Sequence, residues 1–420
     1  MHRRAFLATA GLSVAFAHLD AHAGAKPRGD AKPPPTDRWE ALRAEFDLAP
    51  DKAHLAGFLL ASHPRPVREA IERFRRALDD DPATYLYANN RRLNARVRRA
   101  AASYLGTAPL ELALTDSTTM GLGLVYNAIA LKQGQELLTT THDHYATHEA
   151  LRLRADKHGV TVRKIPLYRD IATVTADELT GTLVENLRPE TRVVAVTWVH
   201  SSTGLKLPLR AFADAIAEVN RARADDDRVL LCVDGVHGLG IEDVTLPALG
   251  VDVFMAGAHK SLFGPRGTGI VWAGPHGRRA LSSTIPSFSR RYGWGGRMTP
   301  GGFHSFEHRW ALAEAFELHE RVGKAAIQQR VHALCRQAKE GLTAMRHVRL
   351  ATPTDDALSA GLVSFNVDGL SPGAVVRALK ARGVIASRAP YEQSYARIAP
   401  GLLNNEADVE AALAAVRSLA

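Results

Sequence analysis

Two apolar runs that each end at an ionisable residue constrain the fold of this chain more than any other feature. Residues 229–233 lead into Asp234, and residues 251–258 lead into His259 and Lys260. Apolar runs of this length, bounded by polar residues, are typical of buried strands. Because α/β proteins bind ligands beyond the carboxyl ends of their strands, we expect Asp234 and Lys260 at one binding site.

Strands and helices alternate over most of the chain. Besides the two opening runs, the expected strands cover residues 111–114, 136–140, 160–166, 193–199 and 267–273. The helices expected between them cover residues 120–131, 146–157, 178–187 and 209–223. This alternation predicts an α/β fold with a mostly parallel sheet between two layers of helices.

The length of the chain, 420 residues, favours two domains. We expect a large domain over residues 53–304, preceded by a linker and an N-terminal helix over residues 24–52. Residues 305–420 begin with two helical stretches and continue as a compact region of short strands and helices. This part of the chain predicts a smaller C-terminal α+β domain.

Residues 1–23 have the pattern of a twin-arginine export signal. Arg3 and Arg4 precede an apolar stretch over residues 5–17, and residues 21–23 form an A-x-A cleavage pattern. The stretch is shorter than the roughly 20 residues that span a bilayer. We therefore expect export to the periplasm without membrane association after cleavage. An ordinary signal peptide or an uncleaved anchor is the alternative.

Composition limits the classes of partner. The net charge of +9 comes from scattered arginines, and no basic tract is interleaved with aromatic residues, so nucleic-acid binding is not expected. The two cysteines, Cys232 and Cys335, are too few for a disulfide framework or a four-cysteine metal site. The pattern is that of an enzyme with a small-molecule substrate.

A lysine and an aspartate at neighbouring strand ends are what a pyridoxal phosphate (PLP) enzyme requires. The lysine amine forms a Schiff base with the cofactor aldehyde, and the aspartate keeps the pyridine nitrogen protonated, so that the ring can accept electrons. At another expected strand-to-helix junction, Ser117, Thr118 and Thr119 offer hydroxyls and helix N–H groups to a phosphate. A plain helix N-cap is the alternative for these three residues.

These motifs resemble those of the class V aminotransferase family of fold-type I PLP enzymes, which includes transaminases, isopenicillin N epimerase-like proteins and cysteine desulfurases. The resemblance runs from about residue 50 to the C-terminus, and residues 234–237 and 259–265 carry it most clearly. It implies a large domain with a seven-stranded type of mostly parallel sheet, a smaller C-terminal domain, PLP as cofactor and a homodimer.

The resemblance also implies roles for individual residues. Lys260 is the Schiff-base lysine, Asp234 the partner of the pyridine nitrogen, and His142 the catalytic histidine that stacks on the cofactor, with His144 as the alternative. The residues expected to contact the cofactor are Lys260, Asp234, His237, Thr118, Thr119, His142, His259 and Ser201. Arg397 matches the arginine that binds the substrate carboxylate, and Arg388 is a weaker candidate.

The chain departs from the family pattern at three places. Residues 388–394 lack the nucleophilic cysteine that desulfurases carry in this loop, so sulfur transfer from cysteine is not expected. Gly257 stands where many relatives have a serine that contacts the phosphate. Residues 307–309 replace a glycine–threonine pair that reaches the phosphate of the partner subunit, and Thr299 is the candidate substitute.

The expected activity is that of an aminotransferase acting on an amino acid or amine. The alternatives are a racemase or epimerase, a carbon–sulfur lyase, and a cofactor-binding relic without turnover. The spacing of His142, His144 and His148 also suits a metal hydrolase, although no clear set of carboxylates accompanies them, and we expect no metal. The aromatic residues considered for the substrate pocket are Phe58, Tyr87, Trp198 and Trp294.

Overall fold

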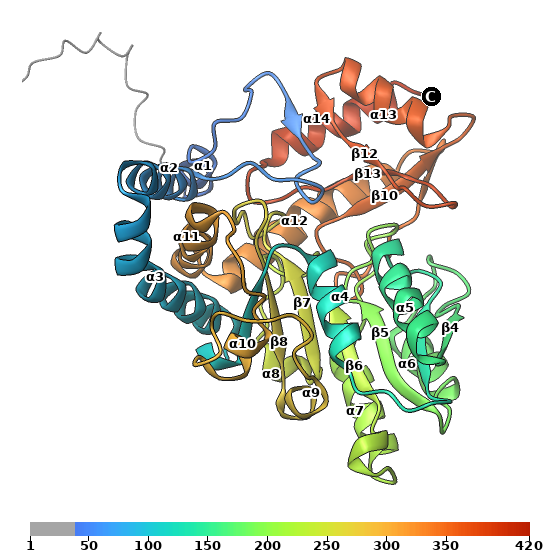
Figure 1. The fold of residues 1–420 in the computed structure, drawn as a ribbon. Coiled ribbons are helices and arrows are strands. Elements are labelled where there is room, and N and C mark those ends of the chain that lie inside the picture. Colours follow the sequence, from blue (N-terminus) through green and yellow to red (C-terminus); the bar gives the residue numbers. More distant parts are fainter. Residues whose placement is uncertain (1–37) are drawn as a thin grey trace, which may run out of the picture.

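The structure, a computed structural model, describes residues 38–420, so the expected export signal and most of the expected linker lie outside the described residues. Its centre is a seven-stranded sheet in the order β2-β8-β7-β6-β5-β3-β4 (Figure 1), parallel except for β8. The strands are β2 (Leu112–Thr115), β3 (Glu136–Thr140), β4 (Thr161–Ile165), β5 (Thr191–Thr197), β6 (Leu230–Asp234), β7 (Val253–Gly257) and β8 (Gly269–Ala273). The expected mostly parallel sheet is confirmed.

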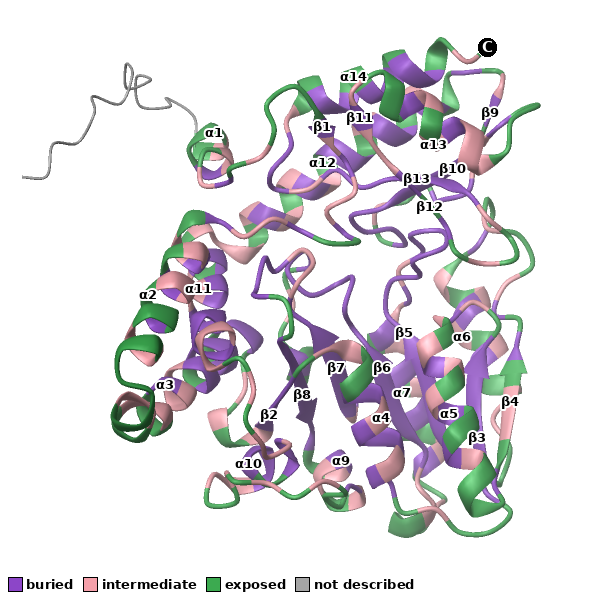
Figure 2. Ribbon diagram, turned by 45° about the horizontal axis from the view of Figure 1, so that its top comes forward, coloured by how far each residue is buried: buried purple, intermediate pink, exposed green. Residues whose placement is uncertain are grey.

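Alternate residues of the central strands enter two separate apolar cores, one on each face of the sheet. In β5, Val193 and Ala195 face α4 and α5, whereas Val194 and Val196 face α6 and α7. These helices are α4 (Thr118–Ala128), α5 (Tyr145–His158), α6 (Ala176–Glu185) and α7 (Leu209–Asn220). Figure 2 shows the central strands in purple, the colour of buried residues, whereas the edge strand β4 is mostly pink and green. Burial on both faces explains why the strands are apolar runs rather than alternating ones.

The strand register brings the carboxyl ends of β5, β6 and β7 together. Thr197 pairs with Asp234 across β5 and β6, and Asp234 pairs with Met255 across β6 and β7. The helix that follows β2 begins at Thr118, and the Ser117 side chain accepts a hydrogen bond of 3.1 Å from the Met120 amide as its N-cap. The loops that follow β2, β5, β6 and β7 therefore open at one edge of the sheet.

A four-stranded antiparallel sheet in the order β12-β13-β10-β9 forms the centre of the C-terminal part. Its strands are β9 (Val348–Leu350), β10 (Val363–Val367), β12 (Ser387–Arg388) and β13 (Ala396–Ile398). The helices here are α12 (Lys324–Thr343), α13 (Pro372–Ala381) and α14 (Glu406–Arg417). Figure 1 shows this part, in orange and red, above the carboxyl ends of β5 to β7.

Two segments connect the N-terminal and C-terminal parts in ways that chain order does not indicate. β1 (Ala53–His54) pairs in parallel with β11 (Val384–Ile385) of the C-terminal part. α11 (Phe306–Val322) packs instead against α2 (Arg65–Asp80) and α3 (Pro82–Leu105), where the Trp310 ring lies 5.6 Å from that of Phe74. The remaining helices are α1 (Arg38–Arg43), α8 (Leu246–Leu249), α9 (Pro275–Ala280) and α10 (Gly293–Met298). Within residues 38–420, no helix combines the length and apolar character that a bilayer crossing requires.

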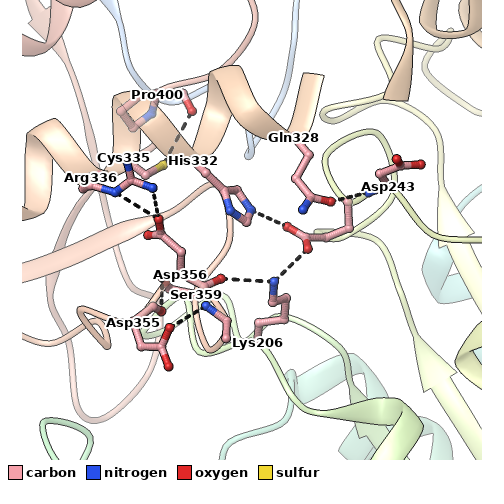
Figure 3. Close-up of polar contacts among 12 residues, drawn as sticks. Lys206, Asp243, Gln328, His332, Cys335, Arg336, Asp355, Asp356, Ser359 and Pro400 are labelled. Atoms are coloured by element: carbon pink, nitrogen blue, oxygen red, sulfur yellow. Dashed lines mark hydrogen bonds and ion pairs between the residues drawn. The ribbon is translucent and has the colours of Figure 1, made fainter. Parts of the chain in front are cut away.

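A cluster of buried and half-buried polar side chains joins the loop after β5 to the C-terminal part (Figure 3). Lys206 Nζ lies 2.7 Å from Glu242 Oε2, and His332 Nε2 lies 2.7 Å from Glu242 Oε1. Lys206 Nζ also donates to the Asp356 carbonyl at 3.2 Å, and Lys339 Nζ lies 2.8 Å from Asp356 Oδ1. We call these five residues the interdomain cluster. It anchors the loop that begins at the carboxyl end of β5.

Candidate active site

A cavity with about 530 Å³ of empty space, counted with its open mouth, lies at the carboxyl ends of the central strands. Most of the predicted cofactor residues line it together. The lining residues are Thr118, Thr119, Leu122, His144, Ala146, Thr197, Ser201, Asp234, Val236, His237, His259 and Lys260. The strand-end pattern in the sequence therefore located one site, although the residues come from loops after β2, β3, β5, β6 and β7.

Lys260 is held in the cavity by a neighbouring imidazole. Its Nζ lies 3.2 Å from His237 Nε2. Burial, with a smaller contribution from the nearby Arg397, lowers the pKa of Lys260 to about 8 against the opposing effect of the Asp234 carboxylate. Burial also holds the pKa of His237 well below its ordinary value, so the neutral ring accepts a hydrogen bond from Lys260. About a tenth of Lys260 is thus an uncharged amine at pH 7, far more than for an ordinary lysine, and a nucleophile or base requires this form.

Asp234 is a buried carboxylate, and no cation in residues 38–420 forms an ion pair with it. Its Oδ1 accepts a hydrogen bond of 3.1 Å from the Val236 amide. Burial raises the pKa of Asp234 to about 6, against the opposing effects of the Val236 hydrogen bond and Lys260. A buried carboxylate with one hydrogen bond retains the capacity to bind a cationic N–H group.

The Thr118 end of the cavity shows how the chain accommodates Gly257. Thr118 Oγ1 accepts a hydrogen bond of 2.8 Å from the Gly257 amide. A Cβ atom added at Gly257 would lie 3.0 Å from Thr118 Oγ1 and 3.1 Å from His259 Cε1. The side chains of Thr118 and His259 therefore occupy the space beside Gly257, and both line the cavity with Thr119. These groups, with the N-terminus of α4, suit a phosphate.

Of the two candidate histidines, His144 and not His142 lines the cavity. The His142 ring stacks on Tyr168 with centroids 4.2 Å apart, and its Nε2 accepts a hydrogen bond of 3.4 Å from the Leu167 amide. His144 is the N-cap of α5, and its Nδ1 accepts a hydrogen bond of 3.1 Å from the Ala146 amide. The prediction for His142 is corrected in favour of His144, because the chain turns into α5 at that residue.

The predicted substrate arginines differ in their surroundings. Arg397 is buried beside the cavity, where it donates to the carbonyls of Ser201 and Arg388 and, at 3.2 Å, to Ser387 Oγ. Its guanidinium lies 4.7 Å from the centre of the Phe58 ring, which in turn lies 5.7 Å from that of His237. The Arg388 side chain is exposed, so this residue contributes a carbonyl rather than a charge. A substrate-binding role for the Arg388 side chain stays a prediction.

Tyr391 is a site residue that our sequence reasoning did not single out. Its hydroxyl makes a short hydrogen bond with Ser201 Oγ, which lines the cavity, and its ring meets that of His144 edge-on, with centroids 6.3 Å apart. The sequence signal that could have identified Tyr391 was its position in residues 388–394, the loop in which desulfurases carry their cysteine.

The aromatic residues considered for the substrate pocket differ in their positions. Phe58 lies next to His237, Tyr87 is exposed, and Trp198 and Trp294 are buried in the apolar cores.

Two further predictions concern groups away from the cavity. The Thr299 hydroxyl is buried within the subunit, where it donates to the Gly295 carbonyl and accepts from the Leu114 amide and Arg98, so it is not directed at a partner subunit. In the part of the chain that the structure describes, no three His, Cys, Asp or Glu side chains are grouped to hold a metal ion. His148 Nε2 lies 2.8 Å from the Thr140 carbonyl.

The cavity contains the kinds of group that PLP requires. Asp234 provides a carboxylate free of ion pairs with the cations of residues 38–420, and Lys260 provides an amine of lowered pKa. Thr118, Thr119 and the start of α4 provide hydroxyl and amide groups for the phosphate, and His144 provides an imidazole beside them. When PLP is bound, it supplies an electron sink for the bonds of a substrate carbon. The residues present therefore fit this cofactor.

Comparisons with known proteins agree with this interpretation of the site. The family model described as Aminotransferase class-V matches residues 63–391. The isopenicillin N epimerase of Streptomyces clavuligerus is 27% identical over 355 residues, which cover 80% of this chain and 85% of that protein. A probable cysteine desulfurase of Vibrio cholerae is 25% identical over 351 residues, covering 76% of this chain and 80% of that protein.

Solved structures show the same fold. A mutant of C-DES with glycine covalently linked to its PLP cofactor superposes with a TM-score of 0.81 at 24% identity, covering 89% of this chain and 98% of that chain. The complex of the cystine C–S lyase C-DES with its product, cysteine persulfide, gives a TM-score of 0.80 at 24% identity, with 88% and 98% covered. The expected fold-type I architecture and the expected PLP cofactor are both confirmed.

Proposed function

The chain belongs to the class V aminotransferase family of PLP-dependent enzymes, and from that premise we propose that it removes the α-proton of an amino acid or amine. The observation that carries the proposal is the contact of 3.2 Å between Lys260 Nζ and Nε2 of the neutral His237 ring. Both residues line the same cavity as Asp234. A lysine amine with a pKa of about 8 is a suitable general base near neutral pH.

Each residue has a separate part in this proposal. Lys260 accepts the α-proton, and His237 orients the amine through its Nε2 lone pair. Asp234 would hold a cationic N–H group of the cofactor. This contact would compensate the buried carboxylate for the hydrogen bonds to water that it lacks. Arg397, which stays beside the cavity through its bonds to main-chain carbonyls, attracts the substrate carboxylate.

Transamination is the first reaction to test, because it needs no group beyond those in the cavity and a 2-oxo acid as the acceptor. Desulfuration is disfavoured by the cysteines. Cys232 lies inside β6 and Cys335 inside α12, both are buried, and burial raises the pKa of each thiol. A buried thiol of raised pKa is a poor nucleophile.

Racemisation or epimerisation is the second candidate. It is favoured by the likeness to an isopenicillin N epimerase over 80% of the chain, and by the Tyr391 hydroxyl, a second proton-bearing group beside the cavity. A carbon–sulfur lyase would instead release a β-substituent. A relic without turnover would bind PLP, and its visible spectrum would not change on adding any amino acid.

The test is to incubate the PLP-loaded protein with each common L-amino acid in D2O and to follow the α-proton signal by NMR. We expect at least one amino acid to exchange its α-proton, and Lys260→Ala to abolish the exchange. Adding pyruvate or 2-oxoglutarate then separates the reactions, since only a transaminase consumes the 2-oxo acid. Absence of exchange with every amino acid, together with an unchanged spectrum, would contradict the proposal and favour a relic.

We also propose that the enzyme is a homodimer. Large apolar side chains close to the cavity are exposed: Leu59 and Leu60 by 58% and 52%, and Met120, one residue after the cavity-lining Thr119, by 40%. A second copy of the chain would cover such side chains. Light scattering on the purified protein should give twice the chain mass, and Met120→Glu should lower it. A monomer at micromolar concentration would contradict this proposal.

Export by the twin-arginine route is a separate proposal that rests on residues 1–23 of the sequence. Folded proteins use this route, which suits an enzyme that loads its cofactor before crossing. Replacing Arg3 and Arg4 by lysine should retain the protein in the cytoplasm, as fractionation of expressing cells would show. Unchanged periplasmic recovery of the double variant would argue for an ordinary signal peptide.

A further inference from the structure

Tyr391 is fixed beside the cavity by a short hairpin of the C-terminal part. The hairpin joins β12 to β13 and is closed by hydrogen bonds from the Ala389 amide to the Tyr395 carbonyl at 2.9 Å and from Ser394 Oγ to the Ala389 carbonyl at 2.7 Å. The Tyr391 ring packs against a small apolar cluster that includes Ala351 and Ala389. Its hydroxyl therefore has a defined position, hydrogen-bonded to Ser201 Oγ at the cavity wall.

The surroundings of Tyr391 suit a group that gives up a proton and takes it back. Burial raises the pKa of the phenol, so it is protonated near neutral pH. Ser201 and the nearby Arg397 act in the opposite direction, because both stabilise the phenolate. Arg397 is itself held by the Ser201 carbonyl, so the three side chains form one unit. Once the phenol has lost its proton, a hydroxyl donor and a positive charge are in place to stabilise the anion.

Tyr391 and Lys260 enter the site from different parts of the fold. Lys260 follows β7 of the central sheet and contacts His237, whereas Tyr391 comes from the C-terminal part and contacts Ser201 and the His144 ring. The cavity thus has a proton acceptor, Lys260, in its lining, and a proton donor of the C-terminal part, Tyr391, hydrogen-bonded to Ser201 of that lining. A base that reaches only one face of a carbon centre returns the proton to that face, so inversion then needs a second proton donor.

We propose that Tyr391 is a second acid–base residue of this enzyme, which protonates the substrate Cα after Lys260 has removed the α-proton and so gives the site the inverting reaction named above as the second candidate. This inference rests on the proposed function, because it begins with the proton that Lys260 accepts. The α-C–H bond breaks and its proton passes to the Lys260 amine, while the Tyr391 O–H bond breaks and a new C–H bond forms. Solvent then takes a proton from Lys260 and returns one to Tyr391, so the reaction is an isomerisation that needs no co-reactant.

The test compares Tyr391→Phe with Tyr395→Phe, a matched loss of one hydroxyl from the same hairpin. Each PLP-loaded protein is given L-amino acids in D2O, with α-proton loss followed by NMR and the D-isomer measured by chiral chromatography. We expect the wild type and Tyr395→Phe to form deuterated D-isomer. In Tyr391→Phe, the ratio of D-isomer formation to α-proton exchange should fall by roughly 10²–10⁴-fold relative to the wild type.

A second variant protects the test against misfolding. Ser201→Ala keeps the phenol but removes its hydrogen-bond partner. Because Ser201 also lines the cavity, the readout is the ratio of D-isomer formation to α-proton exchange, which should fall by roughly tenfold. D-isomer formation by Tyr391→Phe at the wild-type rate would overturn the inference, as would wild-type exchange without any D-isomer. Failure of the wild type to exchange any α-proton would instead overturn the proposed function, and this inference with it.

Discussion

Two buried sets of charged side chains lie between the central sheet and the C-terminal part, and they are built in opposite ways. In the interdomain cluster, Glu242 has Lys206 and His332 within 2.7 Å. In the cavity, Asp234 has a single backbone amide, and Lys260 has a neutral imidazole. Burial raises the pKa of both carboxyls, but hydrogen bonds from His332 and Lys206 bring the pKa of Glu242 below its ordinary value, whereas that of Asp234 stays at about 6.

The difference separates groups that hold the fold together from groups that await a ligand. A buried charge with complete partners stabilises the arrangement of the parts that supply them. A buried charge without a counter-ion reduces stability, and it is retained where a ligand supplies the missing partner. The interdomain cluster and the cavity should therefore respond differently to the loss of one charge.

The largest expected effect is on activity, from Asp234→Asn. We expect the rate of α-proton exchange in the PLP-loaded variant to fall by roughly 10²–10⁴-fold, because an amide cannot hold a cationic N–H group as a carboxylate does. The unfolding free energy of the cofactor-free variant at pH 7 should equal or exceed that of the wild type, since a buried charge without a counter-ion is removed. A large loss of stability would show that Asp234 is a structural residue like Glu242.

The converse is expected for Glu242→Gln. Removing this charge leaves Lys206 buried without its carboxylate, so the unfolding free energy should fall by roughly 3 kcal/mol, measured by urea denaturation. The rate of α-proton exchange should change less than about threefold. Glu410→Gln, at an exposed ion pair on α14, is the matched control and should change stability by less than about 0.5 kcal/mol. If Glu242→Gln were as stable as the control, the interdomain cluster would not stabilise the fold, and the contrast with the cavity would be wrong.

The pH dependence of stability should differ between the wild type and Asp234→Asn. The pKa of Asp234 rises from 3.8 to about 6 on folding, so between these values the folded state retains a proton that the unfolded chain has released. The contribution of Asp234 to stability is therefore lost as the pH rises from about 4 to 6, by roughly 2–3 kcal/mol. In cofactor-free Asp234→Asn this decline should be absent, which urea titrations across that pH range would measure. If the unfolding free energies of the wild type and Asp234→Asn changed in parallel with pH, the raised pKa of Asp234 would be contradicted.

The smallest effect is expected from Gly257→Ser. The added side chain would crowd Thr118 Oγ1 and His259, so we expect a loss of about 1 kcal/mol of unfolding free energy and a severalfold weaker affinity for PLP. The control is Gly123→Ser on α4, where an added Cβ meets no atom within 4 Å. PLP titration by absorbance would measure the affinity. If Gly257→Ser bound PLP more tightly than the wild type, this prediction would be wrong: the added hydroxyl would contact the phosphate, and the space beside Thr118 and His259 would not be limiting.

Elements with a strong periodic pattern were predictable from the sequence. β3 was expected over residues 136–140 and is observed at Glu136–Thr140, and α7, expected over residues 209–223, ends at Asn220. Short strands such as β1 and β13 were not expected, because two or three residues carry no periodicity and their pairing depends on partners distant in sequence. The antiparallel direction of β8 was not predicted either, because it depends on how the strand pairs with β7 and β2 and not on its own residue pattern.

The site was predictable where its residues follow strands directly. Asp234 and Lys260 end or follow buried apolar runs, so their position could be read from the sequence. The choice between His142 and His144 depended on where α5 begins, a matter of two residues. The contact between Tyr391 and Ser201 depends on how the C-terminal part sits over the sheet, which no local pattern records.

The central claim is that Lys260 carries PLP in this cavity. The most direct measurement is the visible absorption spectrum of the purified protein before and after borohydride, with Lys260→Ala alongside. The account predicts a yellow protein whose band is bleached by reduction, with PLP then fixed covalently to the peptide that contains Lys260, and no such band in the variant. A colourless protein that PLP cannot reconstitute, or the same reducible band in Lys260→Ala, would contradict it.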